Sequence, residues 1–114
     1  MLLPHPLPED LAELIARRFR VIGEPMRIRL LDRLRDGGEA TVTDLADAVG
    51  ASQQNVSKHL VLLADAGILA RRKEGTHVHY RIAEEGVFAL CEQVCGSLQE
   101  QLRALDGLIG RGVR

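Results

Sequence analysis

Residues 52–67, SQQNVSKHLVLLADAG, decide the fold. The Ser52 hydroxyl can cap the first backbone N–H groups of a helix, and Gly67 suits its C-terminal end. At about 100° per residue, this helix has one polar side and one aliphatic side. The polar side holds Gln54, Ser57 and Lys58, and the aliphatic side holds Val56, Leu60 and Leu63. We therefore predict an anchored helix that presents amide, hydroxyl and ammonium groups outward.

A shorter helix is predicted immediately before it. Thr43 is expected to be its N-cap, and Leu45, Ala46 and Val49 form its apolar side. The connection to the next helix consists only of Gly50 and Ala51. So short a glycine-containing connection forces the two helices to cross steeply, which is the geometry of a helix-turn-helix.

Two helices are predicted upstream and one long helix downstream. Apolar residues recur at helical spacing from Glu9 to Ile22, and again from Pro25 to a stop at Gly37 and Gly38. An apolar stripe then runs over residues 84–109, and a helix of about 26 residues is about 39 Å long. That is longer than a small domain needs to cover itself, so part of the stripe is expected to contact a second chain.

A β-hairpin is predicted between residues 68 and 82, where apolar and polar residues alternate around Glu74, Gly75 and Thr76. A three-residue loop would gather the basic side chains on one face, and a two-residue loop would mix the faces. We favour the three-residue loop. Its basic face would hold Arg71, Lys73, His77, His79 and Arg81.

Composition agrees with one mainly helical domain. The 114 residues are 46% hydrophobic, 27% charged and only 3% aromatic, so the core must be aliphatic. The net charge of −1 conceals a segregation: residues 1–51 carry −2, residues 52–82 carry +3 and residues 83–114 carry −2. We expect a tail over residues 1–8, the domain over residues 9–110 and a second tail over residues 111–114.

The polar helix side and the basic hairpin indicate DNA. A recognition helix points its first turn at base edges, and cations of a wing meet phosphates. Ser52 is expected to cap the helix or contact phosphate, and Thr43 to contact phosphate. The remaining predicted DNA-binding residues are Gln53, Gln54, Ser57 and Lys58 in the major groove, and Arg71, Lys73 and His77 in the hairpin. The alternatives are an ordinary solvated helix face and hairpin rim, and His59, on the aliphatic side, is expected to pack or hydrogen-bond internally.

The stretches IGEPMRIRLLDRL (22–34) and TDLADAVGASQQNVSKHLVLLADAGILARRKEGTHVHYRI (43–82) strongly resemble the ArsR/SmtB family of winged-helix repressors. The resemblance covers about residues 11–109. It implies a homodimer formed by the first and last helices, with two winged helix-turn-helix units on a palindromic operator of double-stranded DNA. It also implies that an inducer, an ion or a small molecule, releases the DNA.

The sequence does not identify the effector. Many relatives carry a Cys-x-Cys pair before the recognition helix, but ATVTDLA (40–46) has no cysteine; others use His ligands in the last helix, but none follows His79. The thiols are Cys91 and Cys95, which at i and i+4 lie about 6 Å apart on one helix side. Three roles are open for these thiols. They pack in the core, they bind a soft metal or metalloid ion across a two-fold axis, or they act as a redox or sulfur-species sensor.

We therefore predict a non-enzymatic, homodimeric DNA-binding repressor. The chain has no convincing nucleophile–base pair, phosphate-binding glycine loop or carboxylate dyad. The first ten residues, MLLPHPLPED, lack a signal-peptide pattern, and no apolar run is long enough for a bilayer, so we expect a cytoplasmic protein without a membrane partner. A thiol metal-handling protein and a protein-interaction adaptor on the same scaffold are the alternative functions.

Overall fold

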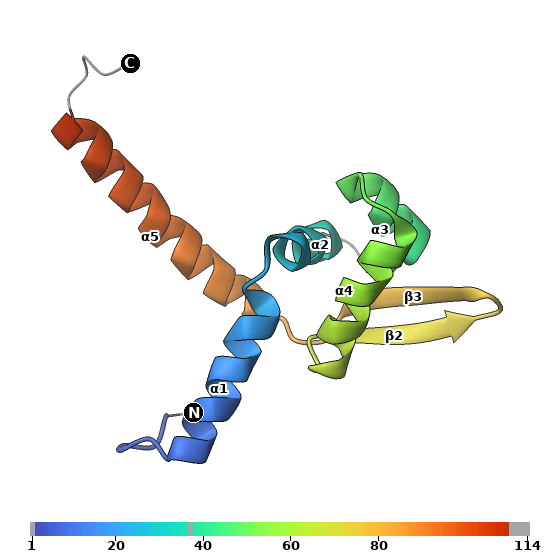
Figure 1. The fold of residues 1–114 in the computed structure, drawn as a ribbon, viewed down its shortest axis with the longest axis horizontal. Coiled ribbons are helices and arrows are strands. Elements are labelled where there is room, and N and C mark those ends of the chain that lie inside the picture. Colours follow the sequence, from blue (N-terminus) through green and yellow to red (C-terminus); the bar gives the residue numbers. More distant parts are fainter. Residues whose placement is uncertain (1, 37, 110–114) are drawn as a thin grey trace. The chain divides into compact units, whose positions relative to one another are not determined.

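The computed structural model describes residues 2–36 and 38–109. The chain forms two compact units, Met1–Glu84 and Glu85–Arg114, which are described separately. Figure 1 shows the elements of both along the chain. Residue 110, the predicted tail 111–114 and the predicted helix stop at Gly37 lie outside the described residues.

The two upstream helices are confirmed. Helix α1 spans Glu9–Ile22 and ends at Gly23, whose N–H donates to the Phe19 carbonyl. Helix α2 spans Pro25–Arg35, with proline in the first turn, where its missing N–H costs nothing. Glu24 caps α2 by accepting a hydrogen bond from the backbone N–H of Arg27 at 3.1 Å. The chain therefore turns between the two helices within Gly23 and Glu24.

The short helix α3 spans Val42–Val49, and its N-cap is Thr41 rather than Thr43. The Thr41 hydroxyl accepts from the Asp44 N–H at 3.1 Å, and the Asp44 carboxylate accepts from the Thr41 N–H at 3.4 Å. This capping box satisfies two backbone donors reciprocally, which Thr43 could not do without an acidic or amide residue three positions later. The prediction of Thr43 as N-cap was wrong by two residues.

Helix α4 spans Gln53–Asp65 and begins where predicted. The Ser52 hydroxyl is its N-cap, accepting from the Asn55 N–H at 3.2 Å. Gly50 ends α3 in the left-handed region, at φ 69°, which allows the chain to reverse direction within a short connection. The turn between α3 and α4 in Figure 1 is thus the predicted helix-turn-helix.

The predicted hairpin is confirmed, and a short additional strand extends it to a three-stranded antiparallel sheet. Its strands are β1 (Ala40–Thr41), β2 (Leu69–Glu74) and β3 (His77–Ile82), in the order β1-β3-β2. Glu74 pairs with His77, so the loop contains two residues and the predicted three-residue loop was wrong. Gly75 has φ 63°, and no described non-glycine residue has a positive φ; a positive φ at the first loop position only is typical of a type II′ turn, whose twist suits a hairpin.

The core of the first unit is aliphatic, as the composition predicts. Its fully buried side chains come from α2, from α4 and from the residue immediately before β2. They include Leu30, Leu31, Val56, Leu60, Leu63 and Ile68. Tyr80 of β3 is also buried, so the sheet closes one side of the helical core. Helix α4 packs against α2, α3 and β2, which fixes its orientation within the unit.

Helix α5 spans Gly86–Ile109 in the second unit, beginning two residues later than predicted. Its apolar stripe is exposed in the single chain at Val94, Leu98, Leu102 and Leu105. No helix in the described part of the chain has both the length and the apolar content that crossing a bilayer requires.

Candidate nucleic-acid interface

Helix α4 presents its polar side to solvent. Gln53, Gln54 and Lys58 are exposed, and Ser57 is half-buried. The opposite side is locked by the fully buried Val56, Leu60 and Leu63, so the helix cannot turn to hide its polar side. The Ser52 hydroxyl caps the helix, while Thr43 is exposed in the first turn of α3. Amide and ammonium groups on a rigid helix suit base edges and phosphates in a major groove.

Two arginines of α2 hold the end of α3. Arg29 donates to the Val49 carbonyl at 3.0 Å, and Arg33 donates to the Ala48 carbonyl at 3.3 Å. The last carbonyls of a helix have no partner within it, so these guanidinium groups satisfy acceptors that would otherwise depend on water. Arg29 and Arg33 thereby serve the geometry of the helix-turn-helix.

His59 lies on the inner side of α4, with 17% of its side chain exposed. Its Nδ1 is 3.0 Å from Nη1 of Arg27 and 3.6 Å from the Glu24 carboxylate. A guanidinium can only donate, so Nδ1 is the acceptor in the contact with Arg27. The expectation that His59 has an internal hydrogen-bonding role is confirmed. The contact ties α4 to the corner between α1 and α2.

The hairpin divides its basic residues between two faces. Residues paired directly across an antiparallel ladder share a face. Arg71 pairs with Tyr80 and Lys73 with Val78, so these two cations lie on the face that continues from the core. Arg72 pairs with His79, and His77 pairs with Glu74, on the other face. The prediction that Arg71, Lys73 and His77 share one face was therefore wrong, because the loop is one residue shorter.

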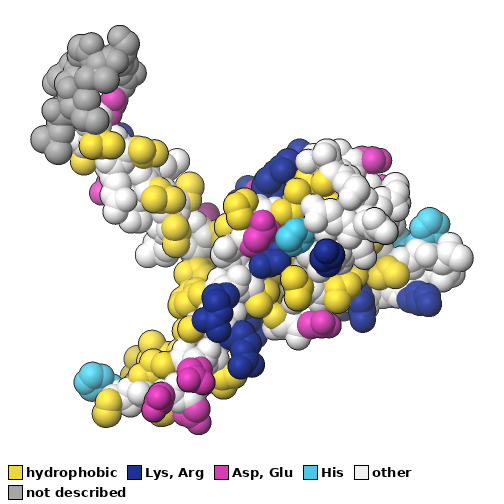
Figure 2. Space-filling model, in the orientation of Figure 1, with side chains coloured by type: hydrophobic (Ala, Val, Ile, Leu, Met, Phe, Trp, Pro, Cys, Tyr) yellow, Lys and Arg dark blue, Asp and Glu magenta, His cyan; other side chains and the backbone are white. Residues whose placement is uncertain are grey.

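Most other arginines are engaged within the protein. Arg18 pairs with Glu84 at 2.9 Å, and Arg35 with Asp32 at 3.3 Å. Among the described residues, the following lysine and arginine side chains have neither a hydrogen bond nor an ion pair: Arg17, Arg20, Lys58, Arg71, Lys73 and Arg81. Apart from the two on α1, all belong to α4 and the hairpin, and Figure 2 shows Lys and Arg side chains near both elements. The unpaired positive charge is thus concentrated beside the helix-turn-helix.

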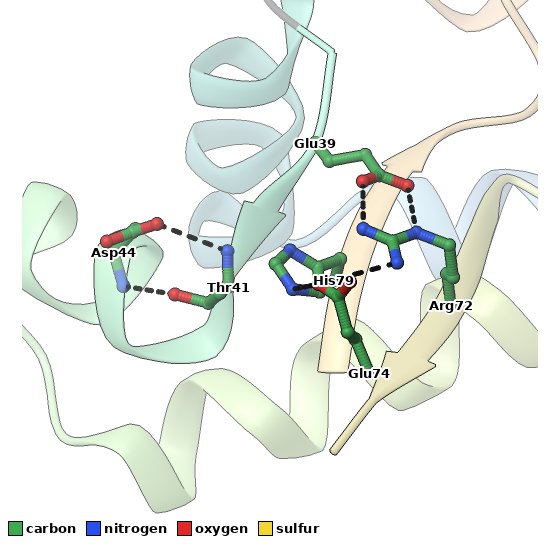
Figure 3. Close-up of polar contacts among 6 residues, drawn as sticks. All are labelled: Glu39, Thr41, Asp44, Arg72, Glu74 and His79. Atoms are coloured by element: carbon green, nitrogen blue, oxygen red, sulfur yellow. Dashed lines mark hydrogen bonds and ion pairs between the residues drawn. The ribbon is translucent and has the colours of Figure 1, made fainter. Parts of the chain in front are cut away.

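Arg72 is the exception within the hairpin. It donates to both carboxylate oxygens of Glu39, at 3.1 Å from Nε and 2.7 Å from Nη2, and lies 3.6 Å from Glu74 (Figure 3). The hydrogen bond from Arg72 holds the pKa of Glu39 below its ordinary value, and the same bond raises the pKa of Arg72. Both groups are therefore charged at neutral pH, and the pair is lost only as the pH falls through the lowered pKa of Glu39.

No local sequence signal marks this pair, because the partners are 33 residues apart and Glu39 precedes a strand too short to produce a pattern. The capping box, in contrast, has a readable signal in Thr41 and Asp44 three residues apart.

The two thiols lie in α5, Cys91 half-buried and Cys95 exposed. In the described part of the chain, no three His, Cys, Asp or Glu side chains gather closely enough to hold a metal ion. One chain supplies two thiols, whereas a tetrahedral thiolate site needs four.

The chain is similar to known transcriptional regulators. The helix-turn-helix domain family matches residues 22–72. A transcriptional repressor SmtB homolog of Synechocystis is 33% identical over 97 residues, covering 85% of this chain and 73% of that relative. The arsenical resistance operon repressor of Escherichia coli is 38% identical over 65 residues, covering 57% of this chain. The chain spans 56% of the length of that repressor, and 64% of another curated relative.

Solved structures share the fold. The homodimeric winged helix-turn-helix DNA-binding domain of a possible ArsR-family regulator from Mycobacterium bovis superposes with a TM-score of 0.71. It is 33% identical, and the match covers 83% of this chain and 87% of that domain. The predicted winged helix-turn-helix is thereby confirmed.

Proposed function

Because this chain belongs to the ArsR/SmtB family of winged-helix transcriptional regulators, we propose that it binds double-stranded DNA as a homodimeric repressor. One observation carries the proposal: the unpaired polar and cationic side chains next to the helix-turn-helix. Lys58 and Lys73 have no partner inside the protein, whereas Arg29, Arg33 and Arg72 are engaged. A folded protein that leaves these charges together without a carboxylate partner is suited to a polyanion.

In the proposed complex, α4 enters the major groove. Gln53 and Gln54 in its first turn reach base edges, and an amide can bond adenine at two positions. Ser57 and Lys58 follow one turn later, with Lys58 on phosphate. The hairpin cations Arg71 and Lys73 contact the backbone, His77 contacts DNA from the opposite hairpin face, and Thr43 contacts phosphate from the start of α3. Ser52 acts as the helix cap, so its hydroxyl contributes by holding α4 in place.

The specificity of this contact is testable with Gln54→Ala. The purified protein is first used to select a duplex from a random library, and its affinity for that duplex and for single-base variants is then measured by fluorescence anisotropy. We expect Gln54→Ala to reduce discrimination at one or two positions by about 1–3 kcal/mol, because one bidentate base contact is lost. Affinity for unrelated duplexes should stay the same.

Asp65→Ala is a suitable control, because Asp65 is exposed at the far end of the same helix. It should retain the selected preference in full. A Gln54→Ala protein with an unchanged preference at every position would contradict the proposed reading role of the first turn.

The homodimer is proposed to form through α1 and α5. Leu14 and Phe19 of α1 are half-exposed, as are Val94, Leu98, Leu102 and Leu105 of α5. Apolar side chains left exposed in series along a helix favour association with a second chain. A two-fold dimer would place two copies of α4 for the two halves of a palindromic operator.

The effector is proposed to act at α5. Cys91 and Cys95 from two copies would supply the four thiolates of a tetrahedral site for a soft metal or metalloid ion, which would bind as the inducer. The E. coli relative is named for arsenical resistance, which favours this class of ion. Two alternatives remain open: the thiols act as a redox or sulfur-species sensor, or they only pack.

The three possibilities predict different effects of metal ions and oxidants on DNA binding by the wild-type protein and by Cys91→Ser/Cys95→Ser. For the wild-type complex with the selected duplex, we expect arsenite or Cd²⁺ at micromolar concentration to release DNA, and the double variant to stay bound. Release by peroxide or persulfide alone would indicate the sensor. If every reagent leaves the wild-type complex intact, while the serine variant is less stable, the thiols only pack and the proposed ion site is wrong.

A further inference from the structure

We propose that Glu39 and Arg72 form an intramolecular clamp that fixes the hairpin for DNA binding, so that Arg72 is a positioning residue and not a phosphate contact. The inference rests on the proposed function, and it adds a role to a residue that a charge count would place among the DNA contacts. It also gives a function to Glu39, which lies outside the predicted interface.

The clamp joins opposite edges of the sheet. The strand order is β1-β3-β2, Glu39 immediately precedes β1, and Arg72 lies on β2. On the central strand, His79 pairs with Thr41 on one side and with Arg72 on the other. Ala40 pairs with Tyr80, so Glu39 lies one residue beyond that row, and the Glu39–Arg72 contact crosses the sheet diagonally from the row of His79 (Figure 3).

Apart from the backbone pairing of Thr41 with His79, the clamp is the contact nearest to the loop that joins the hairpin to the rest of the described unit. Tyr80 is the last buried residue toward the loop, and residues 73–78 contain no buried side chain. The core therefore cannot hold the hairpin tip at a fixed angle. A bidentate pair between a guanidinium and a carboxylate defines direction as well as distance, because two parallel hydrogen bonds must both be aligned. Lys73 is the next residue along β2, so its position depends directly on the clamp.

The charges argue against a second role for Arg72 on DNA. Its guanidinium has two hydrogen bonds to Glu39 and lies 3.6 Å from Glu74, which in turn is 3.5 Å from Nε2 of His79. To bind phosphate, Arg72 would have to release Glu39 and leave a carboxylate facing the polyanion. Arg71 and Lys73, on the other face of β2, have no such competitor. The lowered pKa of Glu39 agrees with a carboxylate committed to Arg72.

The experiment uses Glu39→Gln and Arg72→Gln, with Glu84→Gln as the matched control. The control also removes one arginine–glutamate pair, Arg18–Glu84 at 2.9 Å, but beyond the end of β3 that is opposite the hairpin loop. Amide hydrogen exchange in the free protein reports on the hairpin without DNA. In both clamp variants, we expect the amides of residues 73–78 to exchange about 3- to 10-fold faster than in the wild-type protein, and those of α2 to exchange at the wild-type rate. In the control, we expect the hairpin amides to exchange at the wild-type rate.

DNA binding supplies the second measurement, on the duplex that the wild-type protein selects from a random library. We expect both clamp variants to bind about 3- to 10-fold more weakly, with the wild-type dependence of affinity on salt, because no phosphate contact is lost. The double variant should be no weaker than either single one.

Three results would overturn the clamp. The first is unchanged exchange in residues 73–78. The second is a Glu39→Gln protein that binds DNA more tightly, and the third is an Arg72→Gln protein whose salt slope falls by about one per protomer, which identifies a phosphate contact. If the wild-type protein selects no duplex at all, the proposed function is wrong, while the exchange data still decide whether the clamp exists.

Discussion

The double variant Lys58→Gln/Lys73→Gln is expected to bind its selected duplex on the order of 10² to 10³ times more weakly at about 0.15 M salt. One lysine lies on α4 and the other on β2, and neither has an internal partner. In a dimer the variant loses four phosphate contacts, so the slope of log affinity against log salt should fall by about 3 to 4. Fluorescence anisotropy at several salt concentrations measures both quantities.

The chain offers a charge-matched control in Arg17→Gln/Arg20→Gln. These two arginines are also exposed and without an ion pair, but they lie on α1. The control should bind DNA with nearly the wild-type slope, provided that its dimeric state is verified by light scattering. An equal loss in both variants would mean that only total charge matters, and no loss in either would favour a docking module for another partner over a DNA-binding protein.

The helices were predictable because their signals are local. Caps, prolines and a repeating apolar side lie within a few residues of each other, and α1 and α4 begin at the residues expected. One local signal was misread: Thr43 was chosen over Thr41, although only Thr41 has an acidic residue at the third helical position.

The hairpin register was wrong because the loop was chosen by the distribution of charge. Gathering all basic residues on one face favoured three loop residues, whereas the left-handed Gly75 suits the first position of a two-residue loop. A shift of one residue reverses every side chain of one strand, so His77 moved away from Arg71 and Lys73. The backbone preference of Gly75 therefore predicts the loop length better than the expectation that all basic residues share one DNA-binding face.

The remaining features depend on contacts between distant parts of the chain. Strand β1 has two residues and no periodicity, and it is a strand only because β3 pairs with it. Glu39 and Arg72 are ordinary exposed charges in the sequence. The candidate site was therefore predictable as a set of residue types on α4 and β2, but the division of arginines into engaged and unpaired ones required the fold.

Leu60→Ala is expected to lower the free energy of unfolding by about 3 kcal/mol or more, because Leu60 is fully buried in the core beneath α4. The loss combines the transfer of the removed methyl groups with the cavity that remains, and α4 cannot collapse onto it while α2, α3 and β2 hold its position. Urea denaturation followed by circular dichroism measures the change, at one fixed protomer concentration because dimerisation contributes to stability.

Leu62→Ala separates this effect from a change in helix propensity. It makes the same substitution in the same helix, at a side chain that is 45% exposed. Since little apolar area returns to water and no closed cavity forms, its cost should stay below about 1 kcal/mol. Comparable costs at the two positions would mean that α4 is not anchored by its inner side. The outward direction of Gln54 and Lys58 would then lose its physical basis, because the packing of Leu60 is what turns the polar side of α4 toward solvent.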